Sequence, residues 1–417
     1  MIYLISLICF APFLYMVRFS AFGVPTTLLE ILIYAAAIIT IVIKIRNKSK
    51  VQNSKLKIKS IIHNSPFIIP IILFVLSGII SVAIAPDKRE ALGLFKAYIF
   101  DPILFFFVLI YNLKDGKDLK IIFRSLVLSG VFVSVFAIYQ KITGNVTVDN
   151  RVLGIFLYEP NASPNFLAMY LAPLAVIAFG QSSLMAKNTL QIVLYDLIFF
   201  IIILALYFSG SRAGAAAGAL GMTSFIIIRN WSWIRARLPA KIFLSLAIVL
   251  ALVGIWSLAK PDFSLTESQG SRVSTSNNIR FEIWSTTVKD IIPAKLNWLA
   301  GVGLGNYQNY FTSLTAQRVN YPEYISPWAL TPHNIFLTIW VNLGLLGIVA
   351  FVWLLVAFFK HCKLNPYCLI LTAVMITILA EGLFDSTYWK NDLALIFWII
   401  LASGFATNQG VNNENRN

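Results

Sequence analysis

The residues with the clearest capacity for chemistry lie in PHNIFLTIWVNLGLLG, residues 332–347, where a histidine stands at the start of an apolar run. The imidazole of a histidine ordinarily changes charge near neutral pH, and its neutral form takes a proton from a hydroxyl nucleophile. Asn334 and Thr331 flank His333 and are expected to orient its ring. A histidine that only caps a membrane span fits this position equally well, so the sequence leaves two interpretations open.

Two arginines are expected on the same side as this histidine. Arg212, in YFSGSRAGAAAG, separates two apolar runs with almost no loop between them. The small residues around it are explained by close helix packing, but an arginine exposed to lipid is too costly to be explained that way. Arg280 opens the segment RFEIW. Two guanidinium groups in one region suit a pyrophosphate, because each presents a planar fork of donors to phosphate oxygens.

Four further charged residues are weaker candidates. Asp385, in EGLFDSTYW, is interpreted either as the partner of a nearby arginine or as a functional acid. Arg272, Arg151 and Lys96 are expected to be solvated or to face lipid headgroups. A base, at least two arginines and an acid favour transfer from a lipid-linked phosphate donor over ion conduction.

The composition predicts the structural setting of these residues. Of 417 residues, 58% are hydrophobic and 12% are charged, against about 25% charged in soluble domains. The apolar runs are long and do not alternate, which favours helices over a membrane barrel. We therefore predict an all-α polytopic membrane protein that forms one integral membrane domain over 1–417. About twelve transmembrane helices are expected, at 1–17, 24–43, 66–85, 97–112, 121–140, 165–181, 191–209, 213–229, 242–259, 333–359, 366–384 and 391–407.

Charge predicts the orientation. The connector from Lys44 to Lys59 carries seven cations and no acid, so the positive-inside rule makes it cytoplasmic. The turns 112–120, 229–241 and 360–365 are also basic, as alternation of the spans requires. An even number of spans then places both termini in the cytoplasm. The net charge of +15 is explained by this sidedness and not by a nucleic-acid partner.

One long outer-face loop, residues 260–332, is predicted to contain an interfacial amphipathic helix. Residues 279–292 place Phe281, Trp284 and Val288 on one apolar stripe, and Pro293 is expected to end the helix. The helix is expected to lie on the membrane interface or against other spans.

Several other chemistries find no support in the sequence. No GxxxxGK loop is present, GVGLG at 301–305 lacks the context of a dinucleotide fold, and no HExxH motif or carboxylate pair indicates a metal. No cofactor and no metal are therefore expected. Residues 1–16 lack a basic start and a small-residue exit, so they are interpreted as a first span and not as a cleaved signal.

The combination of SGSRAG at 209–214, NIRFEIWSTTVKDIIPAKLNWLAGVGLGNY at 278–307 and PHNIFLTIWVNLGLLG resembles the O-antigen ligase and O-antigen polymerase superfamily of bacterial envelope glycosyltransferases. The closing FDSTYWKNDLALIFWIILA is similar but more degenerate. The matching region, 209–347, is the expected catalytic core, and the first half of the chain agrees only in being a run of spans.

The resemblance implies a metal-independent, inverting transferase of the GT-C type with an undecaprenyl-pyrophosphate-linked glycan as donor. It implies that Arg212 and Arg280 hold the pyrophosphate and that His333 activates the acceptor hydroxyl. Asp385 matches a further polar position, and Arg272 would replace Arg280 in a shifted register. The acceptor is a glycan, a lipid such as the lipopolysaccharide core, or a protein. The enzyme is expected in the bacterial cytoplasmic membrane with its active site on the outer face. The alternative is a transporter or flippase for a lipid-linked sugar or an anion.

Overall fold

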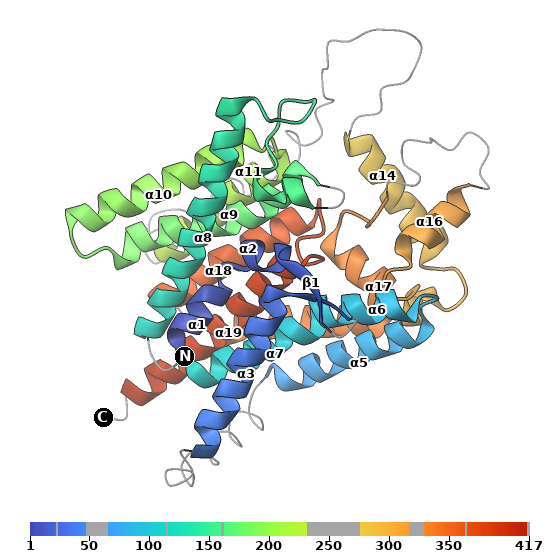
Figure 1. The fold of residues 1–417 in the computed structure, drawn as a ribbon, viewed down its shortest axis with the longest axis horizontal. Helices are drawn as coiled ribbons and strands as arrows, with labels where there is room; N and C mark the ends of the chain where they lie inside the picture. Colours follow the sequence, from blue (N-terminus) through green and yellow to red (C-terminus); the bar gives the residue numbers. More distant parts are fainter. Residues whose placement is uncertain are drawn as a thin grey trace.

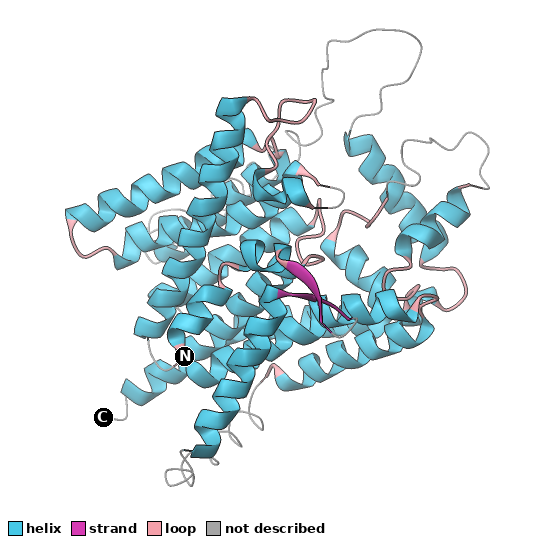
Figure 2. Cartoon of the chain, in the orientation of Figure 1, coloured by secondary structure: helices cyan, strands magenta, loops and turns pink. Residues whose placement is uncertain are grey.

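The computed structural model describes residues 1–21, 24–46, 66–113, 116–159, 162–231, 276–316, 329–362 and 365–414. These residues are mostly helical, and the helices pack into one bundle next to a short antiparallel hairpin (Figures 1 and 2). In chain order the elements are α1 Ile2–Ile8, α2 Ala11–Met16, β1 Arg18–Ala21, β2 Val24–Thr27, α3 Leu28–Arg46, α5 Ile68–Ile84, α6 Lys88–Phe95, the π-helix η2 Lys96–Phe100, α7 Asp101–Asn112, α8 Gly116–Thr143, the 3-10 helix η3 Gly154–Tyr158, α9 Pro164–Met185, α10 Thr189–Phe208, α11 Arg212–Arg229, α14 Ser276–Thr286, the π-helix η4 Thr287–Ile291, α15 Asn297–Ala300, α16 Tyr307–Thr315, α17 Ile335–His361, α18 Pro366–Gly382 and α19 Asn391–Glu414.

Six helices in this part of the chain are long and apolar enough to cross a membrane, and shorter apolar helices accompany them. This confirms the expected all-α membrane architecture. The expected number of twelve spans stays a prediction, and the span expected at 242–259 lies outside the described residues. The six helices are Leu28–Arg46, Lys88–Asn112, Gly116–Thr143, Pro164–Met185, Thr189–Phe208 and Ile335–His361.

The N-terminal segment differs from the single span predicted at 1–17. There α1 ends at Ile8 and α2 begins at Ala11, with Pro12 in its first turn. Proline has no N–H for the preceding turn, so it is tolerated at a helix start and interrupts a helix that would continue through it. Each helix is far shorter than the about 20 residues that a span requires.

Helix α9 occupies the centre of the bundle. Every residue from Leu167 to Ala178 is buried, and the helix packs against α8, α10, α11 and α18. Its N-terminus is capped by Ser163, whose hydroxyl accepts a hydrogen bond from the backbone N–H of Asn165. Because α9 is buried and capped, it fixes the position of Asn165 in its first turn, at one end of the bundle.

Helix α17 breaks at Gly344, which has φ 68° and ψ −168°. At this break the turn after α15 packs against the helix, and Val302 N donates to Val341 O over 2.7 Å. A Cβ at Gly344 would come within 2.1 Å of Leu299 O, so only glycine fits. At this break the segment after α14, including α15 and Val302, packs against α17. It lies close to the half of α17 that begins beside His333.

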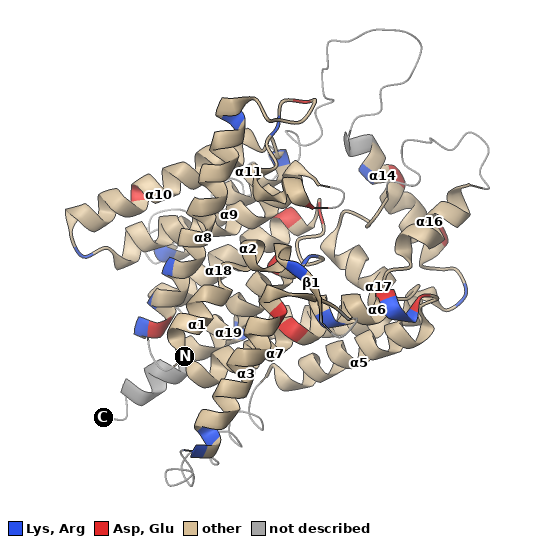
Figure 3. Ribbon diagram, viewed as in Figure 1, with Lys and Arg blue, Asp and Glu red and all other residues tan. Residues whose placement is uncertain are grey.

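Several helix ends meet at the end of the bundle opposite His333. His361, in the last turn of α17, stacks on Phe405 of α19 with ring centroids 5.4 Å apart. The Tyr367 hydroxyl, at the start of α18, donates to Gly116 O at the start of α8 over 2.7 Å. The start of α1 and the basic last turn of α3 lie low in the view of Figure 3. The bundle thus has one end with basic helix termini and another that carries the candidate site.

The helix expected in the long loop is present as α14 and η4, and it ends at Ile291, next to Pro293. Ile283 and Ile291 face the protein, whereas Phe281 and Val288 of the expected stripe are 63% and 49% exposed. The helix is therefore apolar on two sides. Its exposed side suits a membrane interface.

Candidate active site

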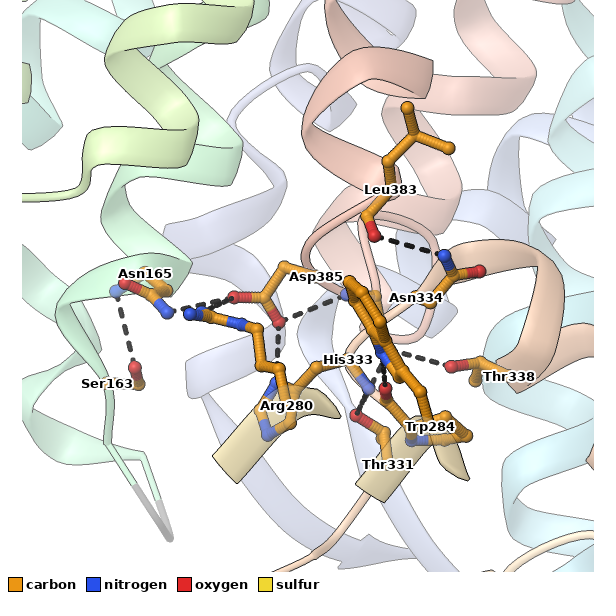
Figure 4. A network of polar contacts seen from close by, with 12 residues as sticks. Ser163, Asn165, Arg280, Trp284, Thr331, His333, Asn334, Thr338, Leu383 and Asp385 are labelled. Carbon is orange, nitrogen blue, oxygen red and sulfur yellow. Dashed lines mark hydrogen bonds and ion pairs between the residues drawn. The ribbon is translucent and has the colours of Figure 1, made fainter. Parts of the chain in front are cut away.

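His333 occupies the turn immediately before α17 with φ 50°, a left-handed conformation that is uncommon for a residue with a side chain. Its backbone N–H donates to Thr331 Oγ1 over 3.4 Å. The indole of Trp284, from α14, donates to Pro332 O over 2.8 Å. The chain around His333 is thus held from two sides (Figure 4), as is typical of strained positions at functional sites.

The carboxylate of Asp385, in the turn between α18 and α19, contacts three other residues of the site (Figure 4). Its Oδ1 lies 3.0 Å from His333 Nδ1. Its Oδ2 accepts from Asn165 Nδ2 over 2.8 Å and lies 3.7 Å from Arg280 Nη2. One buried carboxylate therefore joins a loop, α9 and α14, which lie far apart in the sequence.

The charge of Asp385 follows from these contacts. Burial would raise the pKa of its carboxyl group, but the neighbouring His333 and Arg280 and the hydrogen bonds outweigh this and lower the pKa. The carboxylate therefore accepts a hydrogen bond at neutral pH, which places the imidazole proton on Nδ1. Nε2 of His333 is then left with the lone pair that a general base needs.

Arg151 is linked to this carboxylate through Asn165. Its Nη2 donates to Asn165 Oδ1 over 2.9 Å, and its Nε donates to Ser209 O over 2.6 Å. Burial lowers the pKa of Arg151, and the charges of Arg280 and Arg212 act in the same direction. The three guanidinium groups therefore share one region, next to the histidine and its acid.

The residues around Arg212 explain how this arginine reaches the site. Gly210, with φ 64°, turns the chain between α10 and α11, and Ser211 caps α11 by accepting from Gly214 N. A Cβ at Gly214 would lie 2.7 Å from Ala168 Cβ and 2.9 Å from Glu381 Oε1. The small residues thus let α11 pack closely on α9 and α18. This packing fixes Arg212, the exposed first residue of α11, above them.

A cavity of about 400 Å³ opens beside His333, Asp385 and Asn165. Its walls come from α6, α9, α16 and the turn before α19. Arg151, Arg212 and Arg280 are not among the described residues that line it. The histidine and its acid therefore stand between a cavity and a cluster of arginines.

The structure changes the interpretation of several candidates. Asn334 does not orient the imidazole ring of His333. Its side chain caps α17 by accepting hydrogen bonds from Phe336 N and Leu337 N. Asp385 is the residue that orients the ring. Arg151 is only partly exposed and bound on two sides, and Lys96 pairs with the buried Glu30 at 2.8 Å, so neither is a solvated charge. Arg272 lies outside the described residues.

Two contributors were missed by sequence reasoning, namely Asn165 and the indole of Trp284. A neutral amide after a serine-proline pair carries no charge signal, and only its 2.8 Å contact with Asp385, 220 positions away, identifies it. Among the described residues, no group of three or more His, Cys, Asp or Glu side chains is arranged to hold a metal ion.

Comparison with protein-family models gives a match to part of the chain. Residues 197–352 match the model of a family described as O-antigen ligase. The matched segment contains Arg212, Arg280 and His333, and Asp385 lies outside it. No curated protein matches the chain. The match confirms the predicted resemblance and supports O-antigen ligase-like glycan transfer in general.

Proposed function

We propose that this protein, whose residues 197–352 match the family model described as O-antigen ligase, transfers a glycan from an undecaprenyl-pyrophosphate-linked donor to an acceptor hydroxyl. The observation that carries the proposal is the contact of His333 and Arg280 with the two oxygens of one buried carboxylate, Asp385. This contact supports the proposal because it brings His333, the proposed base, close to Arg280, the proposed phosphate-binding group, as such a transfer requires.

In the proposed reaction the acceptor oxygen attacks the anomeric carbon of the donor sugar. Its proton passes to His333 Nε2, and the bond between the anomeric carbon and the phosphate oxygen breaks with both electrons going to the pyrophosphate. Arg212 and Arg280 stabilise the charge that develops on this leaving group, with Arg151 beside them. Asp385 orients the imidazole and stabilises it once it is protonated. The products are the glycosylated acceptor and polyprenyl pyrophosphate.

The proposed location is the outer face of the bacterial cytoplasmic membrane, with both termini in the cytoplasm. The basic last turn of α3 lies low in the view of Figure 3, on the other side of the bundle from α14, which carries Arg280. The positive-inside rule associates such basic helix ends with the cytoplasm. Region 209–347 would supply the arginines and the base. The acid comes from beyond it, at Asp385.

Release of polyprenyl pyrophosphate tests the proposal. Purified protein in nanodiscs would receive a radiolabelled lipid-linked glycan and a mixture of candidate acceptors, and the products would be separated by thin-layer chromatography. We expect His333→Ala to slow release by about 100- to 10,000-fold, the range of a general base. His361→Ala is the matched control, because His361 lies at the opposite end of the bundle. Unchanged donor with wild-type protein would exclude transfer and favour transport, whereas full release by His333→Ala would exclude His333 as the base.

A further inference from the structure

The cavity beside His333 differs in chemistry from the arginine side of the site. Among the charged groups that line it, Asp385 is paired with Arg280, and Lys390 lies 3.0 Å from Asp392 and 3.5 Å from Glu159. Both charges are therefore already compensated. The described residues of the lining thus offer no uncompensated positive charge to an anionic ligand.

Glu90 is the remaining charge in the lining. It is an exposed residue of α6 at the edge of the cavity, and none of the ion pairs among the described residues includes it. Its carboxyl group rests on Gly305, where an added Cβ would come within 3.2 Å of Glu90 Cδ. A carboxylate in this setting accepts hydrogen bonds from hydroxyl groups and repels other anions.

The walls are aromatic and polar. Trp389 and Tyr98 line the cavity with ring centroids 5.6 Å apart, and Gln308 from α16 adds an amide. Ligand pockets of about 300–1,000 Å³ combine apolar and aromatic walls with a few polar groups. A sugar ring has both the apolar C–H face and the hydroxyl groups that such walls bind.

We propose that this cavity is the acceptor subsite and that it takes an uncharged sugar, with Glu90 selecting against acidic ones. This rests on the proposed function. A displacement in which the nucleophile enters opposite the leaving group needs the acceptor and the pyrophosphate on different sides of the reacting carbon. The arginines provide one side, and the cavity, which shares His333 with them, provides the other.

Binding of simple probes tests the subsite independently of transfer. Full-length protein in nanodiscs would be mixed with methyl glycosides of common hexoses and N-acetylhexosamines, each beside its methyl uronic acid analogue, and saturation-transfer NMR would measure binding. We expect at least one neutral glycoside to bind and its uronic acid to bind about fivefold more weakly, because the carboxylates repel. Glu90→Gln should remove this difference, and Trp389→Leu should weaken the neutral sugar about threefold by removing the ring.

Two controls separate the subsite from the arginine cluster. Arg89→Gln changes a charge on the same helix outside the cavity lining and should leave both ligands unaffected. Inorganic pyrophosphate, followed by ³¹P line broadening, should bind normally to Glu90→Gln and Trp389→Leu and lose binding in Arg212→Ala. The subsite proposal would be wrong if neutral and acidic sugars bound equally well or if no sugar bound. It would also be wrong if Trp389→Leu bound the neutral sugar as well as the wild type. Failure of the transfer itself would instead appear as unchanged donor in the release assay.

Discussion

Two charged clusters lie next to each other in this bundle, and they are built differently. Around Lys390, two cations meet two carboxylates: Lys390 contacts Asp392 and Glu159, and Glu159 also contacts Arg18 at 3.2 Å. The rings of Tyr15 and Phe156 enclose the ammonium group at 4.4 and 4.1 Å.

Around Asp385 the balance is different. Arg280 lies 3.7 Å from this buried carboxylate, Arg151 is linked to it through Asn165, and a cavity opens beside it. A balanced and enclosed cluster stabilises a fold, whereas charged groups beside an accessible cavity are placed to act on a ligand. We therefore interpret the Lys390 cluster as structural and the Asp385 cluster as functional.

Removal of Lys390 should have the largest effect on the stability of the fold. Lys390→Met leaves Asp392, which is fully buried, without its cation and leaves Glu159 with Arg18 alone. We expect a loss of about 3–5 kcal/mol, as for other buried ion pairs that lose one partner, measured by thermal unfolding in detergent. The double variant Lys390→Met/Asp392→Asn should recover part of this loss. Lys289→Met, an exposed lysine, is the control; an equal loss there, or none in Lys390→Met, would refute the structural interpretation.

A conservative change in the Asp385 cluster should reduce the transfer activity and leave the stability of the fold nearly unchanged. Arg280→Lys keeps the charge but loses the planar fork that matches phosphate oxygens. We expect release of polyprenyl pyrophosphate to fall about 100-fold, the scale of one lost electrostatic group in an active site. The measurement is initial rate at saturating acceptor, together with the unfolding midpoint. A variant that unfolds more easily yet reacts at the wild-type rate would reverse the comparison between the clusters.

The pH dependence of stability should identify the ionised form of Asp385. Its pKa is lowered in the folded protein, so its stabilising contribution is present above the unfolded pKa of about 3.9 and is lost as the pH falls through the lower folded value. We expect Asp385→Asn to be less stable by about 1–3 kcal/mol between pH 5 and 8, as for a lost hydrogen bond to a charged group. The difference in the free energy of unfolding between Asp385→Asn and wild type should become smaller below about pH 4. A gap that widens in acid would mean that the carboxyl is protonated in the site.

The sequence predicted the parts of the site that carry a signal of their own. Arg212 is too costly in lipid to be incidental, and His333 follows a proline at the start of an apolar run, so residue type and position identified both. Asn165 and Trp284 could not be found in this way, because their roles depend on contacts with residues from distant parts of the chain.

The fold shows the same division. Hydropathy located most helices, yet it could not show the break of α17 at Gly344, which lies inside an uninterrupted apolar run of the sequence. The break depends on a turn from elsewhere in the chain that packs against the helix at that point. Hydropathy also joined α1 and α2, because Pro12 is not charged and does not interrupt an apolar run.

The smallest effect expected concerns the strained turn of His333. Trp284→Phe keeps the ring but removes the hydrogen bond to Pro332 O, which is worth about 1 kcal/mol or a fivefold change in rate. We expect kcat to fall about fivefold, with KM for donor and acceptor unchanged, because the base is less well positioned while the binding groups stay in place. Trp340→Phe removes an equivalent indole bond, to Trp298 O over 2.9 Å, and should cost similar stability without lowering kcat. Equal kcat losses in the two variants would show that Trp284 supports the fold in general and does not position His333.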